Sequence, residues 1–99
     1  MSEPTHATVA TFRMDMSRAS EHERALRDLI VPGVRRHPGF VGGHWMLDRD
    51  RAQSTVVLTY HSRDSAEAMR DNVIGNAANQ AAAGIELVSI RVLEVTASA

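Results

Sequence analysis

The sequence predicts an α+β domain of the ferredoxin-like kind, with four antiparallel strands and two helices on one face of the sheet. The 99 residues are enough for a single domain, taken as 1–99. Segments with strand-like alternation and segments with helical spacing follow one another in the order βαββαβ. Pro/Gly-rich or polar segments separate most of them. This order is that of the ferredoxin-like arrangement.

The first strand is predicted over residues 7–16, ATVATFRMDM, because Ala10, Phe12, Met14 and Met16 alternate with polar or smaller residues. A helix is predicted over 20–36. Ser20 is the expected N-cap, with Glu23 three residues later as in a capping box.

The apolar stripe of this helix consists of Leu26, Leu29, Ile30 and Val34. Pro32 lies inside the stripe and should kink or end the last turn, because proline lacks the backbone N–H that the helix needs. Pro38-Gly39 ends the helical segment.

A hairpin is predicted next, with strands over 40–48 and 54–61 joined by a polar turn. The second helix begins after Ser62 or Asp64, and Gly75 interrupts it before a weaker helical piece over 76–83. The last strand is predicted over 85–95, IELVSIRVLEV. Residues 1–6 and 96–99 are expected to be loose termini.

The apolar pattern of the strands predicts a homodimer formed by sheet-on-sheet packing. Strict alternation in the last strand places Ile85, Leu87 and Leu93 on one face and Val88, Ile90 and Val92 on the other. Two short helices cover only one face of such a sheet, so a second copy of the sheet is expected on the other.

Composition excludes several classes of function. The net charge is −1 and no basic tract exceeds Arg35-Arg36, which argues against nucleic-acid binding. The absence of cysteine excludes thiol chemistry and fits a cytoplasmic protein. No apolar segment has the roughly 20 residues needed to cross a membrane. No His-x-His or HExxH spacing indicates a metal site, and no cofactor is expected.

The segment VPGVRRHPGFVGGHWMLDRDRAQSTVVLTYHSRDSAEAM, residues 31–69, resembles the centre of the antibiotic-biosynthesis-monooxygenase-like proteins of the dimeric α+β barrel superfamily. The shared elements are a proline late in the first helix, Pro-Gly-Phe at the second strand, and an aromatic residue that ends the third. The resemblance implies a dimeric barrel with a pocket between sheet and helices in each subunit.

Three kinds of function follow from this resemblance. The first is cofactor-independent oxidation of a small flat aromatic, polyketide-like substrate. The alternative is a non-catalytic small-molecule binder or stress-associated protein. Haem degradation is disfavoured because the resemblance implies that haem-degrading relatives carry a tryptophan and an iron-ligating histidine in the second helix. Residues 63–83 contain neither. One fold serves many functions, so the choice depends on the site.

The candidate substrate-binding residues are those that would wall an apolar pocket. Trp45 either fills the core or walls a pocket that opens at Gly43, where a side chain is missing. The other apolar candidates are Phe12, Met14, Leu29 and Met69, for which core packing is the alternative.

The polar candidates for catalysis are Tyr60, Asn72 and Asn76. The Tyr60 hydroxyl could hold a substrate oxygen or form a structural hydrogen bond. Asn72 and Asn76 are spaced i, i+4 on one helix face, with Asn79 and Gln80 nearby, and either line the pocket rim or face solvent. A histidine would suit the role of base.

No histidine is placed in the pocket by the sequence. His22 and His37 are expected at the surface near helix ends. His44 is expected on the dimer side of the sheet, and the position of His61 depends on the register of the hairpin.

Overall fold

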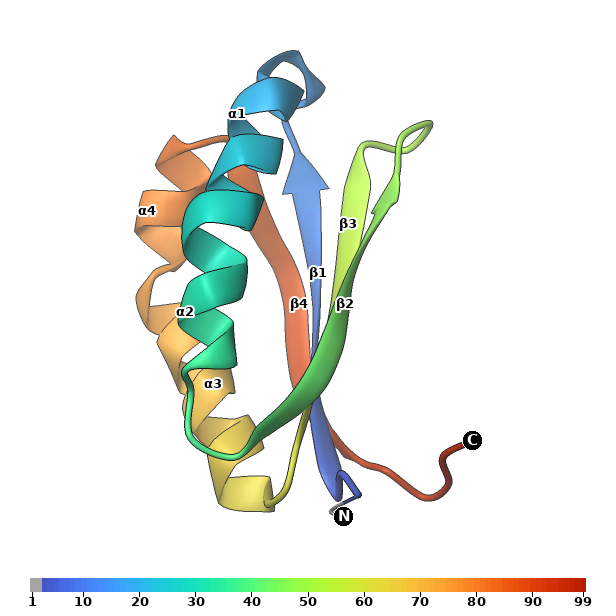
Figure 1. Ribbon diagram of the computed structural model, residues 1–99. Helices are drawn as coiled ribbons and strands as arrows, with labels where there is room; N and C mark the ends of the chain where they lie inside the picture. The colour runs from blue at the N-terminus through green and yellow to red at the C-terminus, as the bar shows by residue number, and fades with distance from the viewer. Residues whose placement is uncertain (1–2) are drawn as a thin grey trace.

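The computed structural model describes residues 3–99 and has the predicted ferredoxin-like fold. Its strands are β1 (His6–Met14), β2 (Phe40–Asp48), β3 (Gln53–Tyr60) and β4 (Ile85–Glu94). They form one antiparallel sheet in the order β2-β3-β1-β4. All helices lie on one face of this sheet (Figure 1). Within residues 3–99 no helix is long and apolar enough to cross a membrane.

The first helical segment starts earlier than predicted. A 3-10 turn, η1 (Met16–Arg18), replaces the predicted end of the strand, and the Asp15 side chain caps it by accepting from the Ser17 N–H at 3.1 Å. Helix α1 (Ala19–Ala25) follows directly, so Ser20 is inside the helix and the predicted capping box is wrong.

Pro32 leaves a visible mark on this helical segment. A π-helical turn, η2 (Leu26–Ile30), precedes α2 (Val31–Arg35), which carries the proline in its first turn. Proline cannot donate a hydrogen bond to the preceding turn, and a π-turn accommodates the missing bond without ending the helix. The three elements form one continuous helical segment over residues 19–35 (Figure 1).

The second helical region divides at Gly75 as predicted. Helix α3 (Arg63–Gly75) is capped by Ser62, whose hydroxyl accepts from the Ser65 N–H at 3.1 Å. Helix α4 (Ala77–Ala82) follows after Asn76. Helix α3 packs directly on the sheet, and the buried Thr8 hydroxyl donates to the Ala66 carbonyl oxygen at 2.7 Å.

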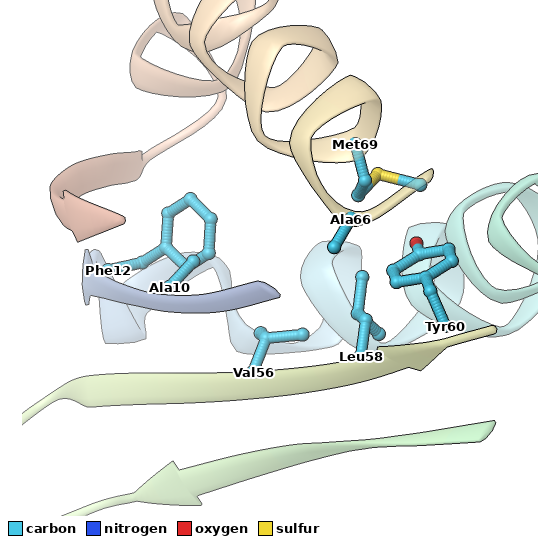
Figure 2. Packing of buried hydrophobic residues seen from close by; sticks show 7 residues of the cluster. All are labelled: Ala10, Phe12, Val56, Leu58, Tyr60, Ala66 and Met69. Carbon is cyan, nitrogen blue, oxygen red and sulfur yellow. The ribbon is translucent and has the colours of Figure 1, made fainter. Parts of the chain in front are cut away.

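The core lies between α3 and the inner faces of β1 and β3, as Figure 2 shows. Its buried members are Ala10, Phe12, Val56, Leu58, Tyr60, Ala66 and Met69. The core is small, which is expected for a chain of this length.

Two irregularities change which face several residues occupy. The register between β1 and β4 shifts near Val88, so Ile85, Leu87, Ile90 and Val92 all pack toward the core. The predicted division of β4 into two apolar faces is therefore wrong. A bulge extends one strand by an unpaired residue, and every side chain beyond it changes face.

A second bulge lies at Val41 in β2. Phe40 pairs with Tyr60 and packs against the core, whereas strict alternation back from His44 would place it on the outer face. Beyond the bulge the alternation is as predicted. Trp45 pairs with Val56 on the helix side, and His44 pairs with Val57 on the outer face.

The N-terminal segment is ordered further than predicted. The Thr5 N–H donates to the Tyr60 carbonyl oxygen at 2.9 Å, and the Val95 N–H donates to the Thr5 carbonyl oxygen at 2.8 Å. The sheet therefore holds the chain from Thr5 onward. The part of the predicted loose terminus that comprises residues 1 and 2 lies outside the described residues.

Candidate functional site

A cavity of about 680 Å³ lies between the sheet and the helical segment 16–34, with α3 and α4 along one side. Pockets for small organic ligands have volumes of about 300–1,000 Å³. Its walls are mainly apolar: Phe12, Trp45 and Leu58 from the sheet, and Leu26, Ile30 and Val34 from the helical segment. The cavity exists because the segment 19–35 does not pack directly on the sheet as α3 does.

The structure brings most of the predicted site residues together. Phe12, Met14, Trp45, Met69, Asn72 and Asn76 all line the cavity. Trp45 and Phe12 supply aromatic surfaces, and Asn72 and Asn76 are solvent-exposed residues at its rim. The arrangement combines flat apolar walls with amide groups at an edge.

Gly43 does not open the cavity wall. A Cβ atom at this position would lie 2.7 Å from Leu58 Cδ2 and 2.8 Å from the Val57 carbonyl oxygen, both too close for contact. The space above Gly43 is therefore filled by Leu58. The glycine lets β2 and β3 approach closely and leaves no space for a ligand there.

Leu29 lies outside the cavity and is 72% exposed. It belongs to η2, whose wider turn changes the angular positions of the residues that follow along the helix. Leu26, Ile30 and Val34, spaced by four, face the cavity instead.

Tyr60 lies behind the cavity wall and is fully buried. Its ring stands on β3 beside Leu58 with the hydroxyl directed toward α3 (Figure 2). The hydroxyl has no hydrogen-bond partner among the described residues, and burial raises the pKa of Tyr60 to about 12. The rings of His37 and Phe40 pack edge-on against it, at centroid distances of 5.6 and 5.8 Å.

Two histidines line the cavity, although both were expected at the surface. His37 follows α2, and its Nδ1 atom is buried with no partner in residues 3–99. His22 comes from α1, and its Nε2 atom lies 2.9 Å from the Ala83 carbonyl oxygen. The sequence carried a weak signal for His22, which precedes Leu26 by four residues and so lies on the same helix face.

A third polar residue, Gln80 of α4, extends the amide stripe. It follows Asn72 and Asn76 at the same spacing of four and lines the cavity with them. Its Oε1 atom is buried and has no partner within the described part of the chain. A buried polar atom without a partner costs free energy, which a donor group on a ligand would recover.

One surface ion pair connects α1 to the turn of the β2–β3 hairpin. Arg49 Nη2 lies 3.4 Å from Glu23 Oε1, and Glu23 also lines the cavity. Both side chains are more than 60% exposed, so the pair contributes little stability. In the described ranges no three potential metal-ligating side chains cluster closely enough to hold a metal ion.

Comparison with known proteins shows the fold. No protein-family model matches the chain, and no curated protein matches it in sequence. Among solved structures, MupZ from Pseudomonas fluorescens is similar with a TM-score of 0.67 and 11% identity, over 91% of this chain and 71% of that one. A monooxygenase from Streptomyces coelicolor, the product of the gene ActVA-Orf6, was solved in complex with the ligand nanaomycin D. It is similar with a TM-score of 0.61 and 16% identity, over 97% and 89% of the two chains.

A third similar structure is Rv0793 from Mycobacterium tuberculosis, with a TM-score of 0.62 and 17% identity over 95% of each chain. At these identities the likeness shows the fold alone. It confirms the predicted fold, which this chain shares with at least one monooxygenase. The functional assignment depends on the cavity.

Proposed function

We propose that this protein binds a small, flat aromatic molecule in the cavity beside Trp45 and oxidises it with molecular oxygen, without a cofactor. The observation that carries the proposal is the cavity itself, with its apolar walls, two aromatic side chains and amide-lined rim. The monooxygenase with the same fold supports the choice of reaction.

Substrates of the anthrone type suit this cavity chemically. Such a molecule loses a proton to give a stabilised carbanion, which reacts directly with oxygen. The protein then needs only to orient the substrate and exclude water. For anthrone the overall reaction consumes one O₂ and yields anthraquinone and one water. Trp45 and Phe12 would contact the rings, and Asn72 and Asn76 would hold the oxygens.

Oxygen uptake with anthrone as substrate tests this proposal. We expect uptake above the rate of a blank without protein. Replacing Asn72 by leucine, which has a similar shape, removes an amide from the rim and should weaken anthrone binding about three- to tenfold, the value of one hydrogen bond. The control is Asp71→Leu, the same kind of change at the neighbouring position, which does not line the cavity.

The possible results separate enzyme from binder. Binding of anthrone without any oxygen uptake, over a panel of anthrones and quinols, would support the alternative of a non-catalytic small-molecule-binding protein. Absence of binding by the unaltered protein would rule out both functions. Equal effects of Asn72→Leu and Asp71→Leu would show that the amide does not contact the ligand.

We also propose that the protein is a homodimer joined through the outer face of its sheet. The corrected register leaves a smaller apolar surface there than the sequence predicted, but helices still cover only the opposite face (Figure 1). Val9 pairs with Val57 on the outer face, and Met46 and Leu93 are 46% and 41% exposed. Sedimentation analysis should give a dimer, and a monomer at micromolar concentration would contradict this arrangement.

A further inference from the structure

The end of the cavity formed by α1 and α4 contains an oriented histidine. Two hydrogen bonds join the start of the first helical segment to the end of the second: Arg18 Nη1 donates to the Ala82 carbonyl oxygen at 3.0 Å, and His22 Nε2 contacts the Ala83 carbonyl oxygen at 2.9 Å. Gly84, with φ +84°, lets Asp15 approach closely, since a Cβ there would lie 2.9 Å from Asp15 Cβ; the same Cβ would lie at ordinary contact distance, 3.4 Å, from His22 Nε2. The position of the His22 ring is thus fixed by backbone.

The hydrogen bond of His22 also determines its tautomer. A carbonyl oxygen only accepts, so Nε2 must carry the hydrogen and donate it to Ala83. In the neutral ring Nδ1 is then the acceptor, with a lone pair. No residue of the described chain forms a hydrogen bond with Nδ1. A ring held through one nitrogen, with the other available as acceptor, is the usual arrangement of a general base.

Charged groups of both signs lie around His22. After proton uptake both nitrogens are donors, and the Ala83 carbonyl continues to accept from Nε2. The Asp15 side chain lies beside Gly84. Hydrogen bonds from Ser17 lower the pKa of Asp15, so its carboxylate is charged near neutral pH. Glu23 is the next residue along α1 and lines the cavity, whereas Arg18 supplies the opposing positive charge.

His37, the other histidine of the cavity, lacks such an arrangement. Its Nδ1 is buried without a partner in residues 3–99, and its ring packs edge-on against Tyr60. No hydrogen bond within this part of the chain fixes its tautomer. His22 is therefore the better-prepared proton acceptor of the two.

We propose that His22 is the general base of this cavity, the residue that removes a proton from the acidic C–H bond of an anthrone-type substrate. This inference rests on the proposed function. In the step, the C–H bond breaks, its proton moves to His22 Nδ1, and the electron pair delocalises onto the ketone oxygen as an enolate.

The amides of the same cavity can stabilise this enolate. Asn79 Nδ2 donates to Asn76 Oδ1 at 3.0 Å, which leaves the Asn76 NH₂ group as a donor for a ligand oxygen. Asn76 and His22 both line the cavity, and the proposal requires that one ligand contact the amide donor and the imidazole together. A hydroxyl on the ligand could in turn donate to Gln80 Oε1.

Hydrogen–deuterium exchange under nitrogen isolates the proton step from the oxidation. The exchange of the methylene protons of anthrone in deuterated buffer is followed by mass spectrometry, and anthrone binding is measured separately by fluorescence titration. We expect the unaltered protein to accelerate exchange over the blank. We expect His22→Gln to lose at least about a hundredfold of that acceleration, the contribution of a typical general base, with binding changed less than twofold.

Glutamine is the informative replacement because its side-chain NH₂ group can still donate to the Ala83 carbonyl. If His22 were only structural, His22→Gln would exchange anthrone protons as fast as the unaltered protein, and the proposal would be overturned. His61→Gln, an exposed site away from the cavity, is the matched control and should behave as the unaltered protein. Should His22→Gln unfold at lower temperature, recovery of exchange in His22→Gly on addition of imidazole gives a second measurement.

The remaining outcomes separate this inference from the proposed function. Loss of exchange in His37→Gln with retention in His22→Gln would assign the base to His37 and overturn the proposal. Binding of anthrone by the unaltered protein without accelerated exchange would also overturn it, while leaving the binding cavity intact. Failure to bind anthrone would contradict the proposed function itself.

Discussion

Replacing Leu58 by alanine is expected to lower the free energy of unfolding by about 2–5 kcal/mol, the usual cost of removing a buried leucine side chain. Leu58 is 4% exposed, belongs to the core cluster and fills the space above Gly43. A domain of this size has a total stability of about 5–15 kcal/mol, so the change removes a large fraction of it. Urea denaturation of the two proteins measures the difference.

Leu29→Ala is the matched control for this prediction. The same atoms are removed from a side chain that is 72% exposed, so the free energy of unfolding should change by less than about 0.5 kcal/mol. Similar losses for the two variants would show that Leu29 is buried, against a partner subunit or among the cavity walls. That result would contradict its exposed position outside the cavity.

Replacing Tyr60 by phenylalanine should stabilise the protein by about 1–3 kcal/mol. The hydroxyl is buried without a partner in the described chain, and a polar group in that state costs about this much. The phenylalanine ring keeps the edge-on contacts with His37 and Phe40. Tyr60→Leu, which removes the ring as well, is the control and should destabilise the protein. A loss of stability in Tyr60→Phe would mean that the hydroxyl has a partner.

The same residue predicts how stability changes at alkaline pH. The raised pKa means that between pH 10 and about 12 the unfolded chain releases the tyrosine proton while the folded chain keeps it. The contribution of Tyr60 to the free energy of unfolding is therefore constant below pH 10. It falls by about 2–3 kcal/mol as the pH approaches 12. The chain has one tyrosine, no lysine and no cysteine, so no other side chain titrates in this range.

Denaturation curves from pH 9 to pH 12 measure this loss. In Tyr60→Phe it should disappear, because the only side chain that titrates in this range has been removed. An equal alkaline loss in both proteins would show that Tyr60 ionises in the folded chain as it does in water.

The order and type of the strands and main helices could be predicted because periodicity and turn residues determine them locally. The face of the sheet on which each strand residue lies could not be predicted. The bulge at Val41 and the register shift at Val88 each displace the alternation by one position. Neither residue is a glycine or proline that would mark a bulge in the sequence. The expected apolar division of β4 failed for this reason, as did the placement of Phe40.

In the candidate site, too, contacts between residues far apart in the sequence could not be predicted. That Trp45, Phe12 and Asn76 line a cavity could be anticipated, because side-chain type and spacing indicate a pocket. The place of His22 at the cavity could not be predicted, because the ring is held by the Ala83 carbonyl, 61 positions away in the chain. Tyr60 was selected for its hydroxyl, but the packing of β3 against α3 places that hydroxyl behind the wall of the cavity.

The helical segment 19–35 covers a cavity, whereas α3 rests on a packed core. Little apolar contact would be lost if this segment opened briefly, so it is the natural unit of local unfolding in the domain. A molecule that occupied the cavity would supply the missing contacts. Binding of that molecule would then favour the ordered segment, and ordering of the segment would favour binding.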